Sequence, residues 1–136
     1  MKKLSMYCMA INNSNFQKIK ELGYIPVGLK NDDFSREWLR DNTLINISKK
    51  NPYYGEYTFY YWYWKNLLKH KKKDEWVGFC SYRELWGEHK DLKNRHSITS
   101  LLKKLPSEWS KYEAIIGEPT TLNRPKWIKL LKHFYI

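Results

Sequence analysis

Short apolar runs alternate with polar breaks along the chain, and this alternation predicts strands separated by helices. Leu4–Ile11, Tyr24–Leu29 and Trp76–Ser81 are apolar enough for buried strands, and Ala114–Gly117 is a shorter candidate. Pro26 lacks the backbone donor that a central strand needs, so we expect an edge strand or an irregular start there.

Helices are predicted between these runs. Phe16–Leu22 is typical of a short helix ending at Gly23. A long helix is expected to begin at Asn51, an N-cap candidate followed by Pro52, and to continue to about His70. The other predicted helical segments are one turn around Trp38, Ser97–Leu105 and a basic helix over Pro125–Phe134.

Strands alternating with helices indicate an α/β domain with an open, mostly parallel sheet. The 136 residues fit a single domain, and no linker or internal repeat divides them. The chain stops at Phe134–Ile136, an apolar stretch directly after a predicted helix. We therefore expect either a chain cut short or a natural miniature of something longer.

One segment is unusually aromatic. Tyr57–Trp64 places seven aromatic rings in eight positions, and we expect almost all of it to be buried. On a helical wheel, Thr58, Lys65 and Lys69 share a narrow polar face, and Glu56 falls on the opposite, aromatic side.

The net charge indicates a partner that carries phosphate groups, but it does not indicate which kind of partner. With 25 basic and 14 acidic residues, the net charge of +11 attracts phosphates in nucleic acid, nucleotide-sugars or anionic lipid headgroups. Nucleic acid is disfavoured, because the rings concentrate in a segment expected to be buried instead of alternating with basic residues.

Localisation is read from the cysteines and the apolar runs. Cys8 and Cys80 lie inside apolar runs, which indicates reduced thiols in a cytoplasmic protein. We find no signal peptide and no apolar run of about 18 residues that would span a membrane. Peripheral contact with an anionic inner membrane stays open.

Glu56 and Arg83 are the candidate catalytic residues. A carboxylate on an aromatic helix face is costly, so Glu56 either pairs with an arginine or amide and locks the fold, or contacts a ligand as a general base. Arg83, with Tyr82, follows the predicted strand Trp76–Ser81, where open parallel sheets bind ligands. Arg83 can grip a phosphate or carboxylate there, or only pair with Glu56 or Glu84.

The polar loop before the long helix supplies candidate substrate-binding residues. Short amides and hydroxyls at a helix start bind sugar hydroxyls or anions, although capping alone requires the same residue types. These candidates are Asn42, Asn46, Ser48 and Asn51. No Asp-x-Asp follows an apolar strand and the four histidines lack ligand spacing, so no metal ligands are assigned and a divalent cofactor stays open.

Several motifs together resemble a known family. They are Tyr24–Gly28, Asp41–Thr43, Asn46–Ser48, Asn51–Tyr54, Glu56–Thr58, Tyr61–Asn66 and Gly78–Arg83. In order and spacing they are similar to an uncharacterised bacterial domain family found among glycosyltransferases of capsule and exopolysaccharide loci. The family domain is usually longer, so the chain resembles its N-terminal portion.

The resemblance implies a glycosyltransferase-A-like fold and sugar transfer from a nucleotide-sugar donor to a surface-polysaccharide glycan. It implies site roles for Asn46, Ser48, Asn51, Glu56, Tyr82 and Arg83. Ser81–Leu85 departs from the His-Tyr-Arg-Arg-Tyr often found in the family, so an inactive or partial form is an alternative. A second alternative is a non-catalytic basic module for nucleic acid or another polyanion, based on the net charge and on Lys126, Lys129 and Lys132.

Overall fold

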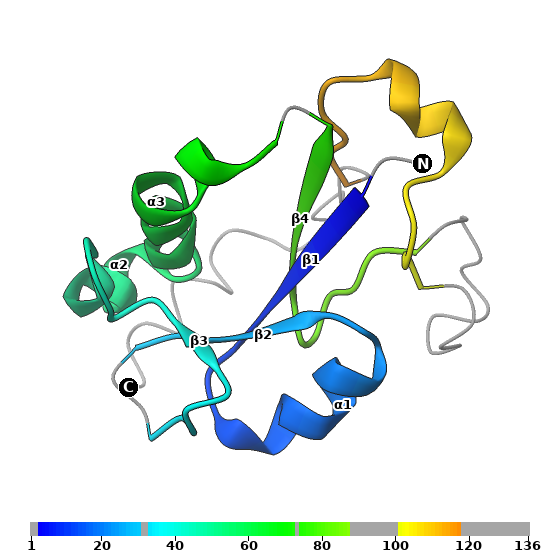
Figure 1. The fold of residues 1–136 in the computed structure, drawn as a ribbon. Helices are drawn as coiled ribbons and strands as arrows, with labels where there is room; N and C mark the ends of the chain where they lie inside the picture. The colour runs from blue at the N-terminus through cyan, green and yellow to red at the C-terminus, as the bar shows by residue number, and fades with distance from the viewer. Residues whose placement is uncertain (1–2, 31–32, 73, 88–100, 118–136) are drawn as a thin grey trace, which may run out of the picture.

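Four parallel strands form an open sheet at the centre of the protein (Figure 1). A computed structural model describes residues 3–30, 33–72, 74–87 and 101–117. The sheet order is β3-β2-β1-β4, with all neighbours parallel. The strands are β1 (Lys3–Ala10), β2 (Ile25–Gly28), β3 (Leu39–Arg40) and β4 (Glu75–Ser81). The predicted α/β class with an open parallel sheet is confirmed, and the arrangement is consistent with a Rossmann-like fold.

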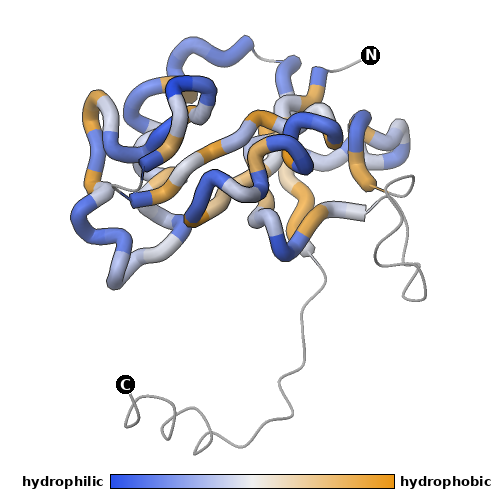
Figure 2. The backbone as a smooth tube through the Cα atoms, turned by 90° about the horizontal axis from the view of Figure 1, so that it is seen from below, coloured by the Kyte–Doolittle hydropathy of each residue, from blue (hydrophilic) through white to orange (hydrophobic). Residues whose placement is uncertain are grey.

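Helices pack on both faces of this sheet, and β1 shows why. Its side chains alternate between two buried clusters, with Met6, Cys8 and Ala10 in one and Tyr7 and Met9 in the other. A strand covered on both faces needs apolar residues at every position, which explains the continuous hydrophobic run. In Figure 2 the hydrophobic segments lie mainly in the interior of the molecule.

Each cluster is completed by one helix. Ile19 from α1 (Phe16–Glu21) packs in the first cluster, and Gly23, at a φ of 74°, ends that helical segment as predicted. Phe59, Trp62 and Tyr63 from α3 (Tyr57–Asn66) pack in the second cluster.

The prediction of one long helix from Asn51 to His70 is wrong. Asn51 begins the short helix α2 (Asn51–Tyr54), and the chain then turns at Gly55, where φ is 55° and ψ is −130°. This backbone conformation suits glycine because it has no Cβ. The helix resumes as α3 and is followed by a 3₁₀ turn over Leu68–His70.

The expected burial of the aromatic segment is also wrong in part. Phe59, Trp62 and Tyr63 are buried, but the Tyr57 and Trp64 residues are 68% and 55% exposed. Thr58, expected on a polar outer face, is fully buried. The rings follow the helical period, so they cannot all face the sheet.

Other expectations change at the sheet edges. Pro26 was expected on an edge strand or at an irregular start, but β2 is an inner strand. The neighbouring strand β3 pairs only with Val27 and Gly28, so Pro26 lies beyond the end of the short β2–β3 ladder. The segment around Trp38 forms a turn before β3 instead of a helical turn, and its ring packs against Phe16 and Phe34.

The predicted strand Ala114–Gly117 is not formed, because this segment makes no strand pairing among the described residues. Residues 101–105 are not helical, whereas Ser107–Lys111 forms a 3₁₀ helix that the sequence did not predict. Residues 97–100 and the predicted basic helix, with Lys126, Lys129 and Lys132, lie outside the described residues.

The two cysteines lie opposite each other on β1 and β4, where Cys8 pairs in register with Cys80. Both are buried and free of disulfides, as the sequence predicted. The hydrogen bond with the Cys8 thiol, together with burial, raises the pKa of Cys80, so its thiol stays protonated at neutral pH.

A buried polar network joins the carboxyl ends of β2 and β3 to the α2–α3 junction. Asp41, directly after β3, is fully buried; its Oδ2 accepts from Thr58 Oγ1 at 2.5 Å and its Oδ1 from the Lys30 amide at 3.2 Å. Asn51 Nδ2 donates to Thr58 Oγ1 at 3.0 Å and to the Gly55 carbonyl at 2.8 Å. The network therefore fixes the turn that separates the two helices.

Asp41 has no cationic partner among the described residues, and burial raises the pKa of its carboxyl above the usual 3.8. The hydrogen bonds from Thr58 and Lys30 offset part of that shift. Because burial dominates this shift, the carboxyl contributes most to the stability of the fold when it holds its proton.

Asp41→Asn is expected to remove one component of the pH dependence of stability. In the wild type this component is fully present below the unfolded pKa and is lost as pH rises through the raised folded pKa. An asparagine amide can donate to Thr58, whose hydroxyl then donates to the Gly55 carbonyl 3.0 Å away. Urea unfolding across pH 4 to 8 should therefore show Asp41→Asn gaining stability relative to the wild type as pH rises.

Asp74→Asn, at an exposed turn position, is the matched control and should leave the pH dependence nearly unchanged. Asp41→Ala should lower the free energy of unfolding by about 1–3 kcal/mol, because the Lys30 amide loses its acceptor. An Asp41→Asn difference that stays constant across this pH range would contradict the interpretation.

Candidate functional site

The strand order reverses between β1 and β4. The chain leaves β1 toward α1 on one face and returns to β4 from α3 on the other face. In open parallel sheets, ligands bind beyond the carboxyl ends of strands at such a switch point. The segments that follow these two strands are therefore the first place to look for a site.

A cleft of about 550 Å³ lies at the carboxyl end of β4. We call it the β4 cleft and define it by Glu56, Tyr60, Ser81, Glu84 and Trp86, which are among its lining residues. Its polar groups come from the start of α3 and from the turn after β4, and its walls are largely aromatic and aliphatic. An apolar cleft with a few convergent polar groups is the usual form of a small-molecule site.

Glu56 is the titratable group most clearly set for chemistry in this cleft. Burial raises the pKa of its carboxyl, and the nearby Glu84 raises it further, whereas Arg83 lowers it. Among the described residues the carboxyl forms no ion pair, so the fold-locking Glu56–Arg pair is not found there. A carboxylate with a raised pKa in a cleft is suited to accept a proton.

The turn after β4 positions Glu84 and Arg83. Ser81 Oγ accepts from the amide of Glu84 at 3.1 Å and from that of Arg83 at 3.4 Å. Arg83 is exposed, and its guanidinium carbon lies 5.4 Å from the centroid of the Tyr82 ring. Arg83 therefore lies close enough to Glu56 to influence its pKa, but neither Arg83 nor Tyr82 lines the cleft.

The predicted substrate-binding loop lies elsewhere. Asn42, Asn46 and Ser48 line a separate pocket of about 440 Å³ with Lys49 and Lys50, and it shares no residue with the β4 cleft. The loop residues and Arg83 were both predicted as site residues, but the loop pocket lies apart from the cleft beside Arg83.

Much of the hydrogen-bonding capacity of this loop is used inside the protein. Asn46 Oδ1 accepts from the Ser48 amide and hydroxyl, and its Nδ2 donates to the carbonyls of Thr43 and Leu44. Asn51 is buried in the Asp41 network. These contacts stabilise the loop and the helix junction without capping a helix, because the N-caps of the two following helices are Ile47 and Lys50 and neither makes a side-chain capping bond.

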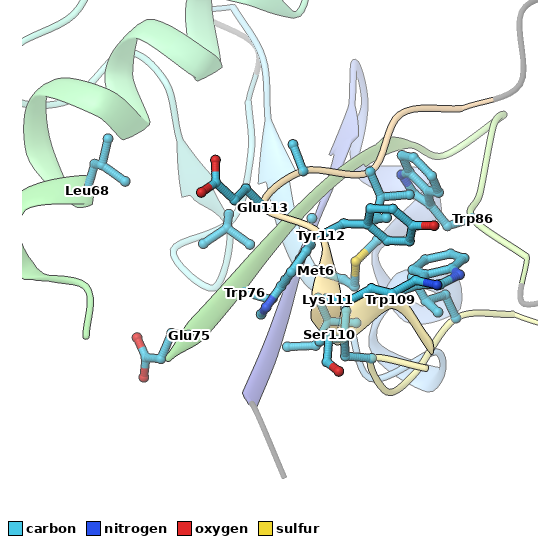
Figure 3. Close-up of a pocket in the computed structure, with 17 residues that line it drawn as sticks. Met6, Leu68, Glu75, Trp76, Trp86, Trp109, Ser110, Lys111, Tyr112 and Glu113 are labelled. Atoms are coloured by element: carbon cyan, nitrogen blue, oxygen red, sulfur yellow. The ribbon is translucent and has the colours of Figure 1, made fainter. Parts of the chain in front are cut away.

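A second cleft, of about 610 Å³, runs along the outer edge of β4 (Figure 3). Its walls carry the side chains of Trp76, Trp86, Trp109 and Tyr112. Glu75 lies apart from Trp86, Trp109 and Tyr112 in the view of Figure 3. Trp86 and Trp109 pack edge to face, with ring centroids 6.5 Å apart, and line both clefts. The β4 cleft therefore continues into an aromatic groove.

The sequence signals for the added site residues differ. Tyr60 follows Glu56 by four positions, so helical spacing alone could have placed both on one face. Glu84 was noted only as a partner for Arg83. Trp86 and Trp109 carried no signal, because no predicted element brought the chain after β4 back against the sheet edge.

No group of three or more histidine, cysteine, aspartate or glutamate side chains that could hold a metal ion is found among the described residues. Among the same residues, no helix combines the length and the apolar character needed to cross a bilayer.

The electrostatic origin of the Glu56 pKa is testable. Removing the negative neighbour with Glu84→Gln should lower the pKa of Glu56 toward 4.5, and removing the positive one with Arg83→Gln should raise it further. Carboxyl-carbon NMR titration of the wild type and both variants measures these shifts. Glu108→Gln, at an exposed position in the 3₁₀ helix, is the control. Shifts of the same sign in the two variants would contradict the arrangement.

Comparison with known proteins gives one match. A family model described as a domain of unknown function, DUF4422, matches residues 5–135. No curated protein and no solved structure matches the chain. Because the match covers nearly the whole chain, the protein belongs to the DUF4422 family, a domain family of unknown function.

Proposed function

We propose that this domain is glycosyltransferase-A-like and transfers a sugar from a nucleotide-sugar to a hydroxyl of a surface-polysaccharide acceptor. The single observation that carries the proposal is Glu56, a partly buried carboxyl of raised pKa in the cleft at the carboxyl end of β4. The resemblance to domains of capsule and exopolysaccharide loci supplies the substrate class.

Each group has a defined role in this reaction. The acceptor oxygen attacks the anomeric carbon, and Glu56 takes the proton from that hydroxyl. The bond between the anomeric carbon and the diphosphate oxygen breaks, and the nucleoside diphosphate leaves with its electron pair. Arg83 faces solvent beside the cleft, where it can approach the leaving diphosphate and offset its charge.

The aromatic groove beside the cleft suits the acceptor. Trp86 and Trp109 belong to both clefts, and Trp76 and Tyr112 extend the groove along β4. Sugar rings have apolar faces that pack on aromatic side chains, while their hydroxyl groups remain hydrated. An acceptor glycan lying along this groove would bring its end toward Glu56.

Calorimetry against a panel of nucleoside diphosphate sugars, with and without Mg²⁺ or Mn²⁺, tests donor binding. Arg83→Ala should weaken donor binding roughly tenfold or more, because it removes a charge-assisted contact. Glu56→Gln should retain donor binding and lose transfer, by about a hundredfold or more. Lys20→Ala, which removes a positive charge from α1, is the charge-matched control and should bind like the wild type.

Absence of binding heat for every donor with the folded wild type would reject the donor site. Equal loss in Lys20→Ala and Arg83→Ala would show that net charge, and not Arg83, accounts for the binding. Donor binding with full transfer activity in Glu56→Gln would reject the role of Glu56 as base.

A further inference from the structure

The outer face of α3 carries a stripe of large side chains that the core does not use. Tyr57, Tyr61 and Trp64 follow one another at intervals of four and three residues, which places them on one side of α3. Tyr57 and Trp64 are 68% and 55% exposed, and Tyr61 is partly buried. The sheet-facing side of α3 is already formed by other residues.

Two rings of this stripe pack on each other: Tyr61 and Trp64 meet edge to face with centroids 5.8 Å apart. Tyr57 instead meets Tyr60, a residue of the β4 cleft, edge to face at 5.4 Å. The neighbouring helix α2 adds Tyr53 and Tyr54, which are 88% and 52% exposed. Figure 1 shows α2 and α3 adjacent to each other beside the sheet. Exposed aromatic groups gathered in this number mark an interaction surface.

The segment of the chain that contains this face carries mostly positive charge. Between Asn42 and Lys72 the chain has six lysines and a single acidic residue, Glu56, which lines the β4 cleft. Both ion pairs found among the described residues involve Glu75, so neither engages Lys65 or Lys69. Lys65 Nζ lies 3.7 Å from the centroid of the Trp64 ring, so charge and aromatic surface meet at one point.

A further exposed apolar pair lies against α3. Asn66 exchanges hydrogen bonds with the Ile45 backbone and Trp62 Nε1 donates to the Thr43 carbonyl, which holds this loop beside the helix. Leu44 has a φ of 48°, which is unusual for a residue with a branched side chain. Leu44 is 76% exposed and Ile45 is 58% exposed. Neither side chain is needed to fill the core.

We infer that this face binds the headgroup region of a lipid bilayer that contains anionic phospholipids. Tyrosine and tryptophan, with an apolar body and a polar edge, are enriched at membrane–water interfaces and at protein interfaces alike, but lysine is depleted at protein interfaces. Lysines beside them attract anionic headgroups. We define the membrane face by Tyr57, Tyr61, Trp64, Lys65 and Lys69. It does not depend on the proposed sugar transfer.

Vesicle sedimentation with the full chain tests this surface. The wild type should bind vesicles of phosphatidylcholine mixed with phosphatidylserine much more tightly than vesicles of phosphatidylcholine alone, and salt should weaken that binding. Lys65→Gln/Lys69→Gln should reduce the affinity by more than tenfold, at roughly fivefold for each lysine. Tyr57→Ser/Trp64→Ser should reduce it by at least as much in low salt.

Matched controls lie away from this face. Lys103→Gln/Lys104→Gln removes the same charge at two exposed positions, and Tyr112→Ser removes a tyrosine that is 51% exposed. Both controls should bind anionic vesicles within about twofold of the wild type, less than the change expected for one membrane-face lysine. Thermal unfolding followed by circular dichroism checks that each variant is folded.

Three results would overturn the inference. One is equal binding of the wild type to neutral and anionic vesicles, and another is equal loss in the control pair Lys103→Gln/Lys104→Gln. The third is a dimer, detected by sedimentation velocity, that dissociates in Tyr57→Ser/Trp64→Ser while vesicle binding persists. That result would assign the face to a second copy of the chain.

Discussion

The buried carboxyl of Asp41 is the contact on which the arrangement of this domain depends. It lies where β3 ends, bonds the backbone after β2 through Lys30, and bonds the first turn of α3 through Thr58. With Asn51 in the same network, it holds the reversal at Gly55 that separates α2 from α3. Without cationic neighbours in the described part of the chain, the group depends on these hydrogen bonds, which ties the strand ends and the helix junction into one unit.

The turn at Gly55 sets which residues of α3 face the sheet and which face solvent. Because α3 starts after the turn at Gly55, Glu56 enters the β4 cleft while Phe59 and Trp62 pack on the sheet. The outward stripe then follows from helical geometry, since residues three and four positions apart share a face. The helix α3 therefore links the candidate catalytic carboxyl of Glu56, at its start, to the proposed membrane face on its outer side.

The two proposals have compatible geometry. The β4 cleft and its aromatic groove lie along the edge strand β4, whereas the membrane face lies on the solvent side of α3. A protein held at a bilayer through α3 would keep both clefts free for donor and acceptor. Lys65, stacked on the Trp64 ring, belongs to this outer side, and Arg83 belongs to the turn after β4. In these two proposals, positive charge serves two separate surfaces, which the net charge alone does not distinguish.

By itself, the sequence determined β1, β2, β4 and the parallel class of the sheet, but it did not predict β3. A strand covered on both faces must be apolar at consecutive positions, so β1 and the parallel class were readable, as was the end of the α1 segment at Gly23. Tertiary structure alone decided the break at Gly55, the burial of Asp41 and the separation of the Asn42–Asn51 loop from Glu56. Local pattern measures how apolar a segment is, but hydrogen-bond partners distant in sequence decide which polar groups are buried and which rings stay exposed.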